Sequence, residues 1–187
     1  MTQRSDDGMR HERSPAEISR RAAVTALIAL PMSAHAATTD DTIAELIKGA
    51  EEKNAAFMRG DMDLWSRLTR IASSFTLMQP FGGPASHGFD TSPKRLAQLA
   101  QYFRNGETKL EVTQTYASDE LIVLVMIELQ RAEVGGLPDQ DWSLRVTEVY
   151  RKHGSEWQLA HRHADPLVQP ITLKQAAALA RGRPEDE

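Results

Sequence analysis

The stretch WSLRVTEVYRKHGSEWQLAHRHADP, residues 142–166, contains two runs rich in β-branched and aromatic residues, one on each side of His153-Gly154. Runs of this kind that flank a glycine predict two strands joined by a turn. We therefore expect one strand over 142–152 and a second one, directly connected to it, over 157–164.

The second of these strands carries two histidines, His161 and His163. Successive side chains of a strand point to opposite faces of its sheet, so both histidines share a face with Trp157 and Leu159. Because the latter two are expected to lie in the core, the pattern predicts that the histidines lie on the covered face as well. A curved sheet closed by helices leaves a cavity at its wide end, and these side chains would line it.

The remainder of the chain places helical patterns before extended ones. Apolar residues recur with the spacing of amphipathic helices early in the chain, and with the patterns of strands later on. The expected helices begin near Thr42, Asp61 and Ser92, the third ending at Asn105-Gly106, and a last one covers 173–180; the expected strands before the hairpin cover 74–79, 110–116 and 121–129. Helices that precede consecutive antiparallel strands predict an α+β fold, a curved antiparallel sheet wrapped around N-terminal helices with a cone-shaped cavity.

The first residues have the pattern of an export signal. A basic triplet, Ser19-Arg20-Arg21, precedes an apolar run over 22–32, and small residues follow it up to Ala36. This order is typical of a cleaved signal peptide, and the two arginines resemble a twin-arginine signal. The run is too short to span a bilayer, which takes about 20 residues. We expect residues 1–36 to be removed on export to a bacterial periplasm and residues 37–187 to form one domain; an unused signal would leave the protein cytoplasmic.

The overall composition excludes several functional classes. The 22 Lys and Arg residues against 26 Asp and Glu give a formal net charge of -4, which argues against nucleic-acid binding. The chain has no cysteine, which excludes disulfides and a thiol nucleophile. The loop at Gly82-Gly83-Pro84 lacks the lysine and the spacing of a phosphate-binding loop, and the chain has no Gly-x-Ser-x-Gly motif. We therefore expect no cofactor, and no membrane anchor in the mature chain.

Three segments of the chain resemble the SnoaL-like branch of the nuclear transport factor 2-like superfamily. They read Arg145-Val-Thr-Glu-Val-Tyr … Gly154 … Trp157-x-Leu-x-His-x-His-x-Asp165-Pro166, Gly60-Asp61-x-Asp63-x-Trp65, and Pro80-Phe81-Gly82-Gly83. The chain is also similar to the association domain of calcium/calmodulin-dependent protein kinase II, which usually has serine where this chain has Asp165. The resemblance covers roughly residues 40–168 and implies the fold expected above. It leaves the activity open, because this scaffold hosts isomerases, dehydratases, cyclases and binding domains.

The resemblance also implies that Arg145, Thr147 and Val149 face the cavity. The alternation of side chains along the strand does not by itself decide which face that is. A guanidinium buried there would need a carboxylate partner, either Glu128 or a carboxylate of the ligand. A second copy commonly covers the outer face of this kind of sheet, so a homodimer is implied too. The segment 121–129, apolar on both faces, agrees with that implication.

Four interpretations of this group of residues stay open. In the first, His161, His163 and Arg145 form a hydrogen-bonded core layer with Glu128 or Asp165. In the second, they surround a small polar or anionic organic molecule. The residues expected to bind that ligand are Arg145, Thr147, Trp65, Phe75, Tyr102, Tyr116 and Glu128.

The third interpretation is general acid/base catalysis. A pair such as His163 with Asp165, or His161 with Glu128, would move the proton, and Tyr102 or Tyr116 would donate to an oxyanion. The fourth is a metal site at His161-x-His163, for which the sequence does not identify a third and a fourth ligand. Our main hypothesis is an exported small-molecule-binding protein without a metal, with catalytic candidates His161, His163 and Asp165. The alternatives are an isomerase, dehydratase or cyclase, and a non-catalytic oligomerisation module.

Overall fold

The computed structural model describes residues 39–181 of the chain. The expected signal peptide, residues 1–36, lies outside the described residues. Among the helices of the described part, none is long and apolar enough to cross a membrane.

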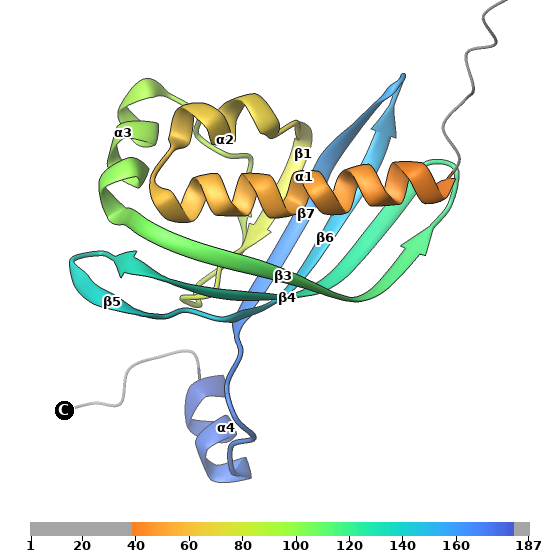
Figure 1. Cartoon of the computed structure of the whole chain (residues 1–187). Coiled ribbons are helices and arrows are strands. Elements are labelled where there is room, and N and C mark those ends of the chain that lie inside the picture. Colours follow the sequence, from red (N-terminus) through yellow and green to blue (C-terminus); the bar gives the residue numbers. More distant parts are fainter. Residues whose placement is uncertain (1–38, 182–187) are drawn as a thin grey trace, which may run out of the picture. The chain divides into compact units, whose positions relative to one another are not determined.

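Three helices precede the long strands in the chain (Figure 1). They are α1 (Thr39–Arg59), α2 (Met62–Leu68) and α3 (Pro93–Tyr102). The side chain of Asp61 caps α2 by accepting from the Leu64 N–H, and Ser92 caps α3, with a proline in its first turn. These two helices therefore begin where the sequence predicts, whereas α1 begins slightly earlier than Thr42.

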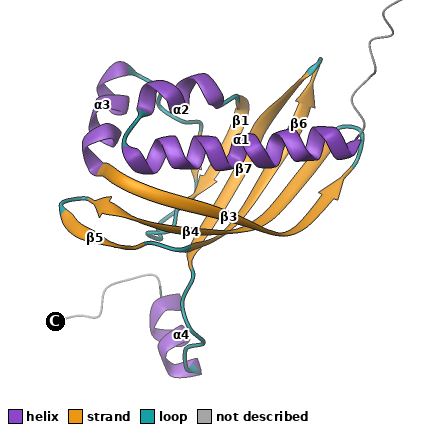
Figure 2. Ribbon diagram, viewed as in Figure 1, coloured by secondary structure: helices purple, strands orange, loops and turns teal. Residues whose placement is uncertain are grey.

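The strands form one curved seven-stranded sheet, on which α1 lies (Figure 2). They are β1 (Ile71–Met78), β2 (Ser86–His87), β3 (Phe103–Ala117), β4 (Leu121–Val134), β5 (Leu137–Asp141), β6 (Leu144–His153) and β7 (Glu156–Pro166). The order is β2-β1-β7-β6-β4-β3, with β5 paired to β4. The predicted α+β architecture is confirmed, but β1 and β7 run parallel, so the sheet is mixed rather than purely antiparallel. A short helix, α4 (Leu173–Ala180), follows β7 and has no buried residue.

The core lies between α1 and the face of the sheet that α1 covers, which we call the inner face. Its buried members are Ala50, Phe75, Ile122, Leu124, Met126, Leu144, Val146, Tyr150, Leu159 and Ala164. The end of α1 approaches β3 so closely that a Cβ on Gly106 would lie 2.5 Å from the Met58 carbonyl oxygen. Only glycine fits at that contact, which fixes the position of α1 over the sheet.

A β-bulge divides β7 into two parts with opposite orientations. Leu159 pairs with Tyr150, whereas His161 pairs with the adjacent residue of β6, Val149, so Ala160 is an extra residue on β7. One extra residue moves every later side chain to the other face of the sheet.

The bulge therefore reverses the expected positions of the histidines. Before it, Leu159 points inward, as predicted. After it, Arg162 and Ala164 take the inner face, and His161 and His163 take the opposite one, which we call the outer face. The prediction that the histidines share the face of Leu159 is wrong for this reason.

Candidate functional site

The predicted catalytic residues do come together, but on the outer face. The His163 Nε2 lies 3.5 Å from the Asp165 Oδ2, and the Arg145 Nη2 lies 3.7 Å from the same oxygen. His161 Nδ1 is 2.7 Å from the hydroxyl of Thr76, and the two imidazole rings are 6.5 Å apart. The expected His163–Asp165 pair is thus present, whereas the prediction that this group lines the cavity is wrong.

On β6, the residues that the resemblance placed in the cavity, Arg145, Thr147 and Val149, lie on the outer face instead. Tyr150 and Glu148 are buried on the inner face, and Thr147 pairs with His163 on the outer one. Arg145 is exposed, and it cannot meet Glu128, whose side chain is buried on the inner face. Both faces of β6 carry apolar residues, so hydrophobic alternation could not decide between them.

The other expected ligand-binding residues fall into three groups. Tyr116 lies on the outer face, paired with Val123, and is 60% exposed. Trp65 and Phe75 are buried in the core, where the ring of Trp65 packs 5.0 Å from that of Phe89. Tyr102 does line a cavity, described below.

The inner face holds a guanidinium between two carboxylates, formed by Arg162 rather than Arg145. Arg162 Nη1 and Nη2 donate to the two oxygens of Glu128 at 2.9 and 2.7 Å. Arg162 Nη1 also donates to Glu148 Oε1 at 3.0 Å. A buried guanidinium with carboxylate partners, predicted from the sequence, is therefore present with a different arginine.

Lys53 of α1 extends this arrangement. Its Nζ donates to Glu148 Oε2 and to the Tyr150 hydroxyl, both at 2.7 Å, and that hydroxyl donates to Glu148 Oε2 at 2.6 Å. We call Lys53, Glu128, Glu148 and Arg162 the inner ion network. Its two cations and two anions balance, so it needs no charged ligand.

Burial and ion pairing act on the carboxyl of Glu148 in opposite directions. Burial alone would raise its pKa, but the two cations, together with hydrogen bonds from Lys53 and Tyr150, outweigh burial and lower the pKa to about 2. Burial opposes protonation of Arg162 as well, yet its two carboxylate partners raise the pKa of that guanidinium. Both groups therefore stay charged at neutral pH.

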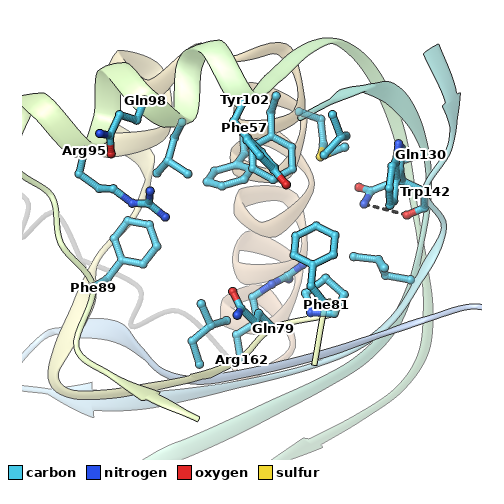
Figure 3. Close-up of a pocket in the computed structure, with 17 residues that line it drawn as sticks. Phe57, Gln79, Phe81, Phe89, Arg95, Gln98, Tyr102, Gln130, Trp142 and Arg162 are labelled. Atoms are coloured by element: carbon cyan, nitrogen blue, oxygen red, sulfur yellow. Dashed lines mark hydrogen bonds between the residues drawn. The ribbon is translucent and has the colours of Figure 1, made fainter. Parts of the chain in front are cut away.

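A cavity of about 390 Å³ lies beside Arg162, under α3 and the loop that follows β1 (Figure 3). We call it the α3 cavity. Its aromatic walls come from Phe57, Phe81, Phe89, Phe103 and Trp142, and its polar groups include Arg95, Gln79, Gln98, Tyr102 and Gln130. Gln130 is held in place, because it accepts from Asn54 at 3.0 Å and donates to the Trp142 carbonyl at 3.1 Å.

Arg95 differs from Arg162 in being exposed and in having no carboxylate within ion-pair distance, although its charge interacts with that of Asp90. Its guanidinium points into the α3 cavity beside the ring of Phe89 (Figure 3). Within residues 39–181 it makes no hydrogen bond or ion pair. Asp, Glu and His are absent from the described residues that line this cavity. The cavity thus combines an apolar body with one exposed cation, Arg95, whose guanidinium has no ion pair.

The chain over 39–181 offers little for a metal ion, since no three of its His, Asp and Glu side chains lie close enough to hold one.

The inner ion network is not predicted above, although the sequence contains one signal for it. Lys53 and Asn54 lie on the apolar stripe of α1, between Ala50 and Phe57, where a buried polar partner is required.

Comparisons with known proteins agree with the fold. No protein-family model matches the chain, and no curated protein matches it. Among solved structures, an NTF2-like family protein of Streptomyces avermitilis, proposed to be a dehydratase, is 18% identical with a TM-score of 0.57, over 71% of this chain and 100% of that one. An NTF2-like superfamily protein of Salmonella enterica is 14% identical with a TM-score of 0.57, over 73% and 99%.

A third similar structure is the calcium/calmodulin-dependent protein kinase II hub homology domain of Chlamydomonas reinhardtii. It is 16% identical with a TM-score of 0.50, over 68% of this chain and 99% of that one. Together these similarities show that the chain has the nuclear transport factor 2-like fold, as its sequence motifs imply.

Proposed function

We propose that the chain is an exported small-molecule-binding protein of the SnoaL-like type, whose ligand occupies the α3 cavity. The cavity has the size of known ligand pockets, about 300–1,000 Å³, and the same mixture of aromatic walls and few polar groups. The signal-peptide pattern of residues 1–36 supports export, with the periplasm as the destination in a bacterium.

The unpaired guanidinium of Arg95 carries the proposal and defines the ligand class. A cation at the wall of an apolar cavity is best satisfied by an anionic group, and Arg binds carboxylates with two parallel hydrogen bonds. The ring of Phe89 beside it favours a flat apolar body. The ligand is therefore a compact aromatic or alicyclic carboxylate.

The enzyme alternative has less support. General acid/base catalysis needs a titratable group within reach of the substrate. Glu128 and Glu148 are held by Arg162 and Lys53, and the histidines point away from the cavity. Among the described lining residues, Tyr102 is the remaining titratable group besides the two arginines.

A thermal-shift series tests the binding proposal. Benzoate, phenylacetate and 2-naphthoate are compared with their neutral amides on the wild type, on Arg95→Gln, and on Lys94→Gln, which removes the neighbouring cation that does not line the cavity. We expect the carboxylates to stabilise the wild type and Lys94→Gln but not Arg95→Gln. Equal stabilisation of both variants, or none of the wild type, contradicts the proposal.

We also propose a homodimer through the outer face of the sheet. The half-buried residues Val123, Val125, Ile127 and Val149 give this face an apolar centre. Light scattering should give twice the mass of the chain for the wild type and the monomer mass for Val125→Asp. A monomeric wild type contradicts this assembly.

Export is tested by mass spectrometry, which should find a mature protein that begins at Ala37.

A further inference from the structure

A second cavity, of about 350 Å³, lies at the other end of the inner ion network. Arg162 borders the α3 cavity, whereas Lys53 and Tyr150 border this one. Its walls come from the first half of α1, the segment that joins α2 to β1, and the β6–β7 hairpin. We call it the α1 cavity. None of the residues predicted from the sequence to bind a ligand lines it.

Lys53 has a hydrogen-bond donor to spare at the wall of this cavity. An ammonium has three N–H donors. Two of them bind Glu148 and the Tyr150 hydroxyl, and no other described residue accepts the third. The side chain is 10% exposed, so the ammonium is nearly enclosed. An acceptor oxygen of a ligand would complete its hydrogen bonding in a setting where such bonds are strong.

Gly49 is a second, independent indication of a bound molecule. It lies inside α1, where glycine is destabilising relative to alanine. No close packing in the described structure requires it, because a Cβ at this position would have no heavy atom within 4 Å. The residue lines the α1 cavity, and the missing side chain leaves room there.

The other walls define what kind of molecule fits. Tyr150 and Trp157 present aromatic rings, and Leu46 adds apolar surface. Because the inner ion network is balanced, the interior offers no unpaired cation to an anion. The lining also includes the carboxylates of Glu45 and Glu156 and one guanidinium, that of Arg70, whose Nη1 donates to the carbonyl oxygens of Arg67 and Thr69. The two carboxylates outnumber the one guanidinium, so a charged carboxylate is disfavoured there, in contrast to the α3 cavity.

We infer that the α1 cavity is a second small-molecule site, for a neutral compound with an apolar ring and one acceptor oxygen that binds Lys53. The inference does not depend on the function proposed for the α3 cavity. It predicts two sites with opposite preferences, one for carboxylates at Arg95 and one for neutral carbonyl or hydroxyl compounds at Lys53.

Prodan, a neutral naphthyl ketone whose emission moves to the blue in apolar surroundings, tests the site directly. With the full chain we expect saturable, blue-shifted emission. Gly49→Leu places a bulky side chain in the cavity and should weaken binding by about tenfold or more. Ala44→Leu adds the same side chain at an exposed position of α1 that does not line the cavity, and should bind like the wild type.

Two further measurements separate the possible outcomes. Gly49→Leu should unfold at no lower temperature than the wild type, because leucine is the better helix former, so a loss of binding is not a loss of fold. 2-Acetylnaphthalene should displace prodan at about a tenfold lower concentration than 2-ethylnaphthalene, which lacks the acceptor. Arg95→Gln should leave prodan binding unchanged.

The inference is overturned by any of three results. These are the absence of saturable binding, equal binding to Gly49→Leu and the wild type, and equal displacement by the two naphthalenes. A loss of carboxylate binding at Arg95 with prodan binding intact would instead affect only the function proposed for the α3 cavity.

Discussion

The two faces of the β6–β7 pair both carry an arginine beside a carboxylate, but they hold these groups very differently. On the inner face, Arg162 meets Glu128 at 2.7 Å, and that carboxylate is 2% exposed. On the outer face, Arg145 and Asp165 are 3.7 Å apart and 60% and 48% exposed. The same chemical pair is therefore a fixed part of the core in one place and a solvated surface contact in the other.

The side of the sheet, rather than the residue type, therefore decides what a charged group does. Inside, removing one partner leaves an uncompensated charge in a poorly solvated site. Outside, water and salt replace most of the lost interaction. One extra residue, Ala160, turns Arg162 inward, whereas the regular pairing of β6 with β4 keeps Arg145 on the outer face.

The largest expected effect comes from breaking the inner ion network. Glu148→Gln removes the carboxylate between Lys53 and Arg162, and should lower the free energy of unfolding by about 3–5 kcal/mol. Asp165→Asn, the matched change on the outer face, should cost at most about 1 kcal/mol. Urea unfolding of both variants measures the difference, and equal losses would contradict the contrast between the faces.

Low pH should destabilise the folded protein by protonating the carboxylate of Glu148. The pKa of Glu148 in the folded chain, about 2, is below its ordinary value of 4.5. Its contribution to stability is therefore complete above about pH 4.5 and is lost as the pH falls towards 2. The shift corresponds to about 3 kcal/mol.

Unfolding free energies measured between pH 6 and pH 3 should fall more steeply for the wild type than for Glu148→Gln. Parallel curves would show that Glu148 does not carry a lowered pKa. Asp165→Asn is the control, and its curve should follow that of the wild type.

The smallest expected effect is that of removing both imidazoles. His161→Ala combined with His163→Ala should change the free energy of unfolding by about 1 kcal/mol or less, since both side chains lie on the outer face. Carboxylate binding in the α3 cavity should stay within about twofold of the wild type by calorimetry, whereas Arg95→Gln should lose about tenfold or more. A large loss in the histidine variant would return these residues to the binding site.

The fold could be predicted largely because its signals are local. Asp61 and Ser92 begin helices through their own side chains, and the hairpin around Gly154 follows from β-branched runs and a turn. The prediction that Asn105-Gly106 ends the third helix is wrong, because α3 ends at Tyr102 and Gly106 lies in β3. Its actual role is the close approach of α1 to β3, a contact between distant parts of the chain.

The site could not be predicted to the same extent, because it depends on one irregularity. The regular alternation of side chains along β7 predicts the correct face up to Leu159 and the wrong face after Ala160. No residue type in the sequence marks that bulge. The partner logic was sound, since a buried arginine does lie between carboxylates. The resemblance implies Arg145 at that position, but the hairpin carries three arginines, Arg145, Arg151 and Arg162, and the register that turns Arg162 inward forms only in the sheet.

The bulge in β7 turns Arg162 inward and the imidazoles outward, and nuclear Overhauser effects test this orientation most directly. We expect cross-peaks between the ring protons of His161 and the side chains of Thr76 and Val149, with none to the core residue Leu124. Cross-peaks from either imidazole ring to Leu124 or to Lys53 would contradict the account, because they would place the histidines on the inner face.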